Sequence, residues 1–175
     1  RARLLDGADP LAGIQTRVWG RWCNFEIGDY PSDATGLVTS GDMKEAEYRM
    51  TLRQPGIWPA EHVVRATKSG EPAALQVRRL GGVRIAARNP LGDPLPGATV
   101  ELVSLEFQQS VADWIAGGLV ASPVQGLRTD AQGELVLSGR PNGAYRARLR
   151  HGDAQATLDV SVPAKGVASV PVTLK

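Results

Sequence analysis

Hydrophobic and polar residues alternate with a period of two along several stretches of the chain. In the C-terminal part, residues 145–150 alternate between apolar side chains and arginines, and 157–162 and 169–174 repeat the pattern. A period of two places successive side chains on opposite faces of a strand, so these stretches predict strands with one buried and one exposed face. Pro171 cannot donate a ladder hydrogen bond, which predicts that the last strand lies at a sheet edge.

The chain also contains an internal repeat. Asp-Pro-Leu-Ala-Gly-Ile over 9–14 recurs as Asp-Pro-Leu-Pro-Gly-Ala over 93–98, at an offset of 84 residues. Ser-Asp-Ala-Thr-Gly over 32–36 recurs as Thr-Asp-Ala-Gln-Gly over 129–133, at an offset of 97 residues. Self-similarity of this kind indicates two copies of one structural unit.

The repeat predicts two homologous units, at 1–80 and 81–175, with Gly81 and Gly82 as the hinge between them. The 20 glycines and 12 prolines are spread along the chain, which favours many turns between short strands. About seven short strands in each unit are typical of an antiparallel β-sandwich. The predicted fold is therefore all-β, with two consecutive antiparallel β-sandwich domains.

The two offsets differ by 13 residues, which places an insertion between Gly97 and Thr129. Apolar side chains in this stretch follow the spacing of one helix face, and Gly117-Gly118 ends the run. A short helix that the first unit lacks is predicted here. It either covers the open end of its own sandwich or docks a partner domain. The candidate docking residues are Phe107, Val111, Trp114 and Ile115.

The second unit resembles the carboxypeptidase regulatory-like family. The motifs that carry the resemblance lie at 82–85, 92–102, 129–133 and 141–147. The first unit matches more faintly, because 43–47 replaces the Pro-x-Gly before its tyrosine. The turn motifs are specific for fold and say little about chemistry.

This resemblance implies a transthyretin-like (prealbumin-like) β-sandwich in each unit. It further implies a non-catalytic accessory domain, of a kind commonly appended in tandem to secreted or surface proteins. By the same resemblance we expect an extracytoplasmic location, whether periplasmic, cell-surface or secreted. The expected partners are other domains or subunits of a parent assembly.

Composition and charge exclude several classes of function. The 20 Lys and Arg residues against 18 Asp and Glu give a net charge of +2, which does not predict binding to nucleic acid. The single cysteine, Cys23, can form neither an internal disulfide nor a Cys-rich zinc site. No apolar run reaches the roughly 18 residues that cross a bilayer, so no membrane insertion is expected.

Catalysis and metal binding are not expected either. The two histidines, His62 and His151, fall in different units and have no candidate ligand or nucleophile at strand or helix spacing. A Ser-His-Asp site needs a histidine within reach of the nucleophile, and a metal site needs clustered ligands. The chain is therefore predicted to be no enzyme and to hold no cofactor or metal.

Aromatic side chains crowd into one segment of the first unit. Four of the nine aromatic residues fall between Trp19 and Tyr30, and Trp58 lies in a Pro-Gly-Ile-Trp-Pro segment. Flat rings beside polar groups suit stacking on a saccharide or gripping a peptide, whereas a small sandwich also uses tryptophan to fill its core. The candidate ligand-binding residues are Trp19, Arg21, Trp22, Phe25, Tyr30 and Trp58.

A stripe of basic residues lies on the predicted outward face of one strand. Arg146, Arg148 and Arg150 either bind an anionic polysaccharide or acidic partner, or form an ordinary solvated face. The favoured function is a non-catalytic structural, spacer or assembly module of a larger extracytoplasmic protein. The alternative is a carbohydrate- or peptide-binding module that uses the aromatic segment.

Overall fold

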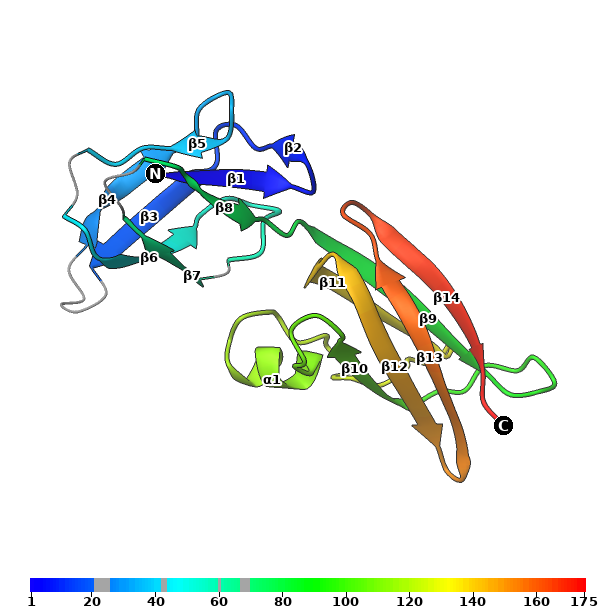
Figure 1. Cartoon of the computed structure of the whole chain (residues 1–175). Helices are drawn as coiled ribbons and strands as arrows, with labels where there is room; N and C mark the ends of the chain where they lie inside the picture. Colours follow the sequence, from blue (N-terminus) through cyan, green and yellow to red (C-terminus); the bar gives the residue numbers. More distant parts are fainter. Residues whose placement is uncertain (21–25, 42–43, 60, 67–69) are drawn as a thin grey trace. The chain divides into compact units, whose positions relative to one another are not determined.

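Short strands joined by turns form most of the chain in the computed structural model (Figure 1). The structure describes residues 1–20, 26–41, 44–59, 61–66 and 70–175. Contacts among these residues divide the chain into two units, Arg1–Arg79 (unit 1) and Leu80–Lys175 (unit 2). Helix α1 (Val111–Ala116) in unit 2 is the one α-helix of the described ranges. The chain is therefore all-β apart from one short helix, as its sequence predicts.

Unit 1 is a sandwich of two sheets. In one sheet β1 pairs with β2, β5 and β8, and the other sheet has the order β4-β3-β6-β7. The strands are β1 (Ala2–Asp6), β2 (Asp9–Pro10), β3 (Gln15–Gly20), β4 (Glu26–Pro31), β5 (Leu37–Val38), β6 (Glu47–Leu52), β7 (Glu61–Arg65) and β8 (Ala73–Gln76).

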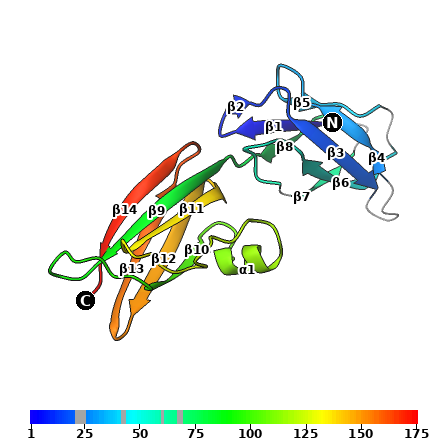
Figure 2. The same cartoon turned by 180° about the vertical axis from the view of Figure 1, so that it is seen from behind.

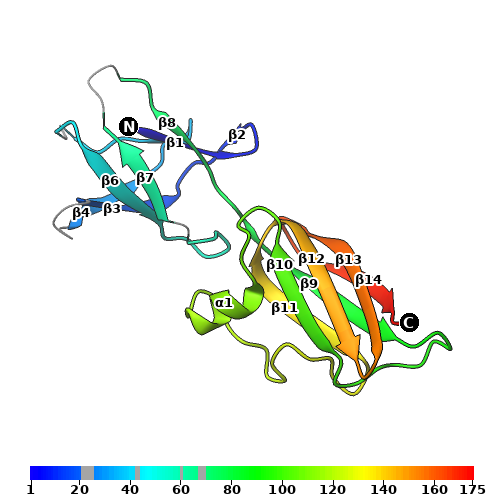
Figure 3. The same cartoon turned by 60° about the horizontal axis from the view of Figure 1, so that its bottom comes forward.

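Unit 2 is built in the same way. One sheet has the order β11-β9-β14 and the other the order β10-β12-β13 (Figure 3). The strands are β9 (Leu80–Arg88), β10 (Thr99–Ser104), β11 (Glu134–Pro141), β12 (Gly143–His151), β13 (Ala154–Val162) and β14 (Val167–Thr173).

The first and last strands of each unit are parallel neighbours. Strand β8 pairs in parallel with β1, and β14 pairs in parallel with β9. The other strand pairings within the two units are antiparallel. Parallel neighbours need a long crossover connection, and the strands of the second sheet supply it. The chain therefore enters each unit at one end and leaves it at the other.

The alternation seen in the sequence decides which face of each strand is buried. In β12 the apolar side chains Tyr145, Ala147 and Leu149 are buried and the arginines between them are exposed. In the last strand Val172 is buried next to an exposed Pro171, and β14 is an edge strand. The period-two prediction for β12 and the edge-strand prediction from Pro171 are confirmed.

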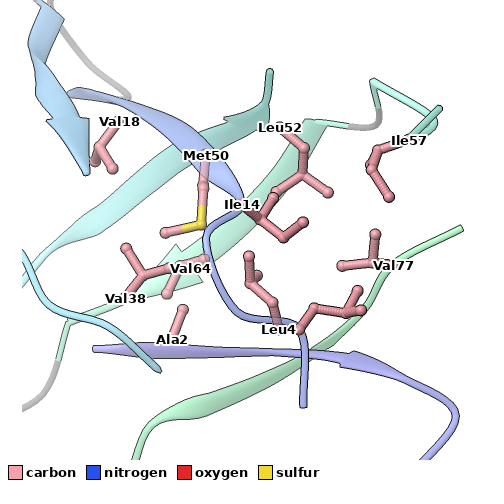
Figure 4. Packing of buried hydrophobic residues seen from close by; sticks show 11 residues of the cluster. Ala2, Leu4, Ile14, Val18, Val38, Met50, Leu52, Ile57, Val64 and Val77 are labelled. Carbon is pink, nitrogen blue, oxygen red and sulfur yellow. The ribbon is translucent and has the colours of Figure 1, made fainter. Parts of the chain in front are cut away.

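The core of unit 1 lies between its two sheets (Figure 4). Aliphatic side chains from both sheets converge there, with Met50 of β6 facing the side chains of the β1 sheet. The buried residues of this cluster are Ala2, Leu4, Leu11, Ile14, Val18, Val38, Met50, Leu52, Ile57, Val64 and Val77. Burial of such apolar surface is the main favourable contribution to folding.

The inserted segment of unit 2 occupies the place that a strand takes in unit 1. In unit 1 the outer edge of β3 is paired with β4. In unit 2 the corresponding edge of β10 is covered by the segment that carries α1, through bridges from Val103 to Ser110 and from Thr99 to Arg128 (Figure 2). An open edge would expose unpaired backbone groups, so each unit covers this edge by different means.

The two glycines predicted as a hinge lie inside β9. Gly81 pairs with Arg140 and Gly82 with Ser138, and both glycines are buried. A Cβ on Gly81 would collide with the carbonyl oxygen of Pro163, and a Cβ on Gly82 would lie 2.8 Å from a backbone oxygen of β11. The hinge prediction is wrong, because glycine is needed here for close backbone approach within the sheets.

Candidate functional site

An aspartate organises the same turn in both units. Oδ1 of Asp33 accepts hydrogen bonds from the backbone N–H groups two and four residues further on, at 2.8 and 3.0 Å. Oδ1 of Asp130 makes the equivalent bonds at 2.9 and 2.8 Å. The Thr35 hydroxyl is the largest cause of a lowered pKa at Asp33, followed by the backbone bonds. The carboxylates therefore act as local turn formers.

A buried hydroxyl group precedes each of these aspartates. Oγ of Ser32 donates to the carbonyl of Leu11 at 2.6 Å and accepts from the N–H of Ile14 at 2.9 Å. Oγ1 of Thr129 makes the same two bonds, at 2.6 and 2.9 Å, to the backbone of the 95–98 loop. Each hydroxyl thus satisfies two backbone groups that the fold removes from water.

A glycine completes the arrangement in each unit. Gly36 and Gly133 have φ values of +73° and +72°, which favour glycine. A Cβ on Gly36 would lie 2.5 Å from the oxygen of Leu4, and one on Gly133 would lie 2.7 Å from the oxygen of Ala87. We call these sets the turn clamps. They consist of Ser32, Asp33 and Gly36 in unit 1, and of Thr129, Asp130 and Gly133 in unit 2.

The turn clamps account for most of the repeated sequence motif. Their residues stand 97 positions apart, and each clamp holds the preceding Asp-Pro-Leu loop of its own unit. The motif therefore serves the fold.

The described aromatic residues of unit 1 do not share one surface. Trp19 lies on the outward face of β3, where the Arg17 guanidinium sits 6.0 Å from its ring centroid. Tyr30 pairs with the buried Thr16 and packs on the core, so it faces the other way. Trp58 is only 7% exposed. These three rings therefore form no common platform among the described residues, and ligand binding by the whole predicted set stays a prediction.

The remaining candidate ligand-binding residues, Arg21, Trp22 and Phe25, lie outside the described residues. The outward face next to Trp19 is occupied by an ion-pair network. Arg17 forms a two-pronged pair with Asp29, at 2.8 Å for each bond, and reaches Glu26 at 3.1 Å. The hydrogen bond with Arg17 is the largest cause of a lowered pKa at Asp29. The charges beside Trp19 are thus paired within the protein.

Helix α1 packs against its own unit. The Trp114 ring meets Phe107 edge-on at 5.9 Å and Tyr145 edge-on at 6.2 Å, and its Nε1 donates to Gln109 at 2.7 Å. Val111 and Trp114 are 0% and 2% exposed. Of the four candidate docking residues, these two have almost no surface to offer a partner, whereas Phe107 and Ile115 are half-buried.

Arg140 is a buried cation that the alternation pattern misses. It is 1% exposed, and it donates to the carbonyls of Ser138 at 2.7 Å and Ala121 at 3.0 Å. A β-bulge between Ser138 and Arg140 turns its side chain inward. Burial lowers the pKa of its guanidinium. Arg140 therefore ties the segment after α1 to β11.

A small pocket lies in the interior of unit 1. A pocket of about 20 Å³ between its sheets is lined by Val18, Val38, Met50, Val64 and other residues. This volume accommodates about one water molecule. Within the described ranges, no three His, Cys, Asp or Glu side chains gather at one place. No helix in this part of the chain is both long and apolar enough to cross a membrane.

The two histidines take different positions in the fold. His62 on β7 is half-buried opposite Met50, and no hydrogen-bond partner for its Nε2 exists among the described residues. Burial lowers the pKa of His62. His151 is exposed at the end of β12. The imidazoles thus belong to separate units, as the sequence indicates.

Several solved structures resemble the chain at low sequence identity. The Bacillus anthracis TIE protein is 15% identical with a TM-score of 0.44, and the match covers 99% of this chain and 33% of that one. GBS52, the minor pilin of Streptococcus agalactiae, is 14% identical with a TM-score of 0.48, over 95% and 84%. The shaft pilin SpaA from Lactobacillus rhamnosus GG is 13% identical with a TM-score of 0.39, over 99% and 95%.

The chain thus spans about a third of the TIE protein. No family model matches the sequence, and no curated protein matches it.

Proposed function

We propose that the chain is a tandem pair of transthyretin-like sandwich modules that acts as a non-catalytic spacer or assembly module. In this proposal it belongs to a larger extracytoplasmic protein, and its partners are the neighbouring domains or subunits of that protein. The carboxypeptidase regulatory-like motifs support the module type and the location. The strand topology supports the spacer role.

The parallel pairing of first and last strands is the observation that carries the spacer role. Strand β9 enters unit 2 and β14 leaves it in the same direction, and β1 and β8 do the same in unit 1. Each unit therefore advances the chain by the length of a strand instead of returning it to its starting point. A nine-residue strand such as β9 spans about 30 Å.

The matching turn clamps support the idea that the units are copies of one module. Serine or threonine, aspartate and glycine occupy equivalent places and make the same bonds in both. The sheets also correspond. In each unit the first strand has the last strand as a parallel neighbour and another strand as an antiparallel neighbour. Independent origins would not be expected to reproduce each of these bonds.

A short joint supports a stiff spacer. The N–H of Val77 donates to Leu5 at 2.8 Å, the carbonyl of Arg78 accepts from Trp58 at 2.7 Å, and Arg79 is ion-paired within unit 1. The next residue, Leu80, begins the first strand of unit 2. Residues 77–79 are held by bonds within unit 1, and residue 80 already belongs to a strand of unit 2. No free linker residue therefore separates the two units.

Small-angle X-ray scattering tests the spacer role. We expect the chain to scatter as a particle with a narrow distribution of maximum dimensions. A variant with about ten Gly and Ser residues inserted between Arg79 and Leu80 should broaden that distribution, since such linkers behave as flexible coils. If the natural chain already scatters as broadly as the insertion variant, the spacer proposal is wrong.

A further inference from the structure

Figure 3 shows the β10-β12-β13 sheet. The pairing of its strands places a row of basic residues across its outward face. Thr99 pairs with Arg150 on one side and bridges to Arg128 on the other. Arg150 in turn pairs with Gln155. Directly opposite residues of neighbouring strands share a face, so these four side chains lie in one line. All four are exposed.

The last residue extends this line. The backbones of Gln155 and Lys175 exchange hydrogen bonds, at 3.0 and 3.5 Å. Neighbouring strands are about 4.8 Å apart, so Arg128 and Arg150 are separated by about 10 Å, and Lys175 lies about 10 Å beyond Arg150. We call this line, Arg128, Thr99, Arg150, Gln155 and Lys175, the basic row. Its cations alternate with a hydroxyl and an amide side chain.

The cations of the basic row differ from the other arginines of the same face. Arg146 pairs with Asp159 through two hydrogen bonds, at 2.9 and 3.3 Å. Arg148 stands between Arg146 and Arg150 on β12, and its guanidinium lies 3.5 Å from the Glu101 carboxylate. Among the described residues, Arg128 and Arg150 have no acidic partner. The arginines of the basic row are therefore free of ion pairs within the described residues.

A shallow depression of about 240 Å³ lies at this end of the face. It is lined by Thr99, Val100, Glu101, Arg148 and Arg150. An anion seated there would meet the unpaired guanidinium of Arg150 next to the Thr99 hydroxyl. Guanidinium groups bind carboxylates and sulfates through charge-assisted hydrogen bonds.

We propose that the basic row binds a linear anionic polysaccharide that lies across the strands. Cations about 10 Å apart would contact carboxylate or sulfate groups along such a chain, while Thr99 and Gln155 would hydrogen-bond its hydroxyl groups. The described residues of this face include no aromatic side chain, and single-stranded nucleic acid is held largely by stacking on aromatic rings. The assignment extends beyond a spacer role, because it gives unit 2 a ligand.

Isothermal titration of the full chain tests the proposal with defined polymers. Polygalacturonate and dextran sulfate present carboxylate and sulfate groups respectively, neutral dextran is the uncharged control, and polyglutamate is the acidic polypeptide arm. We expect binding to at least one anionic polysaccharide, none to dextran, and weaker affinity as salt is added, because exposed charges are screened. The stronger of the two anionic polymers identifies the anionic group.

Charge-neutralising variants locate the site. Arg150→Gln and Arg128→Gln should each weaken binding about tenfold, the effect of one lost charge-assisted hydrogen bond. Arg146→Gln is the matched control, since it is on the same strand and face but paired with Asp159; its affinity should change less than about twofold. Circular dichroism verifies that each variant is folded.

The proposal is wrong if neither anionic polysaccharide binds, or if all three variants lose affinity equally. It is also wrong if polyglutamate binds more tightly than the polysaccharides. Each of these outcomes leaves the spacer role untouched, because scattering measures it independently.

Discussion

Ser32 and Thr129 each satisfy two backbone groups that would otherwise be buried without a partner. We expect Ser32→Ala to lower the free energy of unfolding of unit 1 by roughly 1–3 kcal/mol, and Thr129→Val to do the same in unit 2. Urea denaturation measures both. Thr129→Ser is the control, because it keeps the hydroxyl and should cost less. Equal losses for Thr129→Ser and Thr129→Val would show that the hydrogen bonds contribute little.

Glycine is required at position 81 because the backbone of the connection between β13 and β14 lies close to it. A Cβ there would collide with the carbonyl oxygen of Pro163, which has no flexible side chain to yield. We expect Gly81→Ala to destabilise unit 2 by about 2 kcal/mol or more. Gly41, whose added Cβ would meet nothing within 4 Å, is the control for alanine substitution. A stable Gly81→Ala variant would mean that the sheets separate easily here.

His62 makes the stability of unit 1 depend on pH. Burial lowers its pKa in the folded state, so the unfolded state takes up a proton first as the pH falls. The free energy of unfolding should therefore be highest above the unfolded pKa of about 6.5, and should decrease as the pH falls through it toward the folded pKa.

Urea denaturation between about pH 7 and pH 5 measures this loss. His62→Leu should flatten the profile in this window, while the exposed His151→Gln should leave it unchanged. A profile that His62→Leu does not alter would assign the pH dependence to other groups.

Helix α1 stabilises unit 2 through the side chains that it buries. Trp114 is buried and meets the rings of Phe107 and Tyr145 edge-on. We expect Trp114→Ala to lower the free energy of unfolding of unit 2 by roughly 3–5 kcal/mol. Ile115→Ala, a half-buried neighbour on the same helix, should cost clearly less. Near-equal values for the two variants would place the helix outside the cooperative core.

The capping box at the start of α1 makes a smaller contribution. Oγ of Ser110 accepts from the N–H of Asp113 at 3.1 Å, and the Asp113 carboxylate accepts in return. Ser110→Ala should therefore cost about 1 kcal/mol. Because the helix has six residues, tertiary packing supplies most of its stability.

At the scale of the whole molecule, each unit has its own sheets and interior. Differential scanning calorimetry should show that Ser32→Ala shifts the unfolding of unit 1 and Thr129→Val that of unit 2. With independent units each variant moves one transition and leaves the other in place. If both variants move a single common transition, the two units unfold as one cooperative body.

Much of the fold follows from local signals. The period-two alternation gives the buried face of β12, and the Asp-Ala-x-Gly motif gives the aspartate bonds of the turn clamps, because these groups lie within four residues of one another. The arrangement of the candidate binding residues does not follow from local signals. Trp19 and Tyr30 are close in sequence but lie on adjacent strands and face opposite sides of the sheet, which depends on the register between β3 and β4.

The sequence by itself determined the all-β character, the repeated turns, the place of the inserted helix and the edge position of Pro171, since these depend on short-range geometry. Tertiary structure alone decided that first and last strands run in parallel, that Gly81 packs against another strand connection, and that Arg140 is turned inward. It also aligned Arg128 with Arg150 across Thr99. Each of these features joins residues distant in the chain, and only the pairing of the strands brings them together.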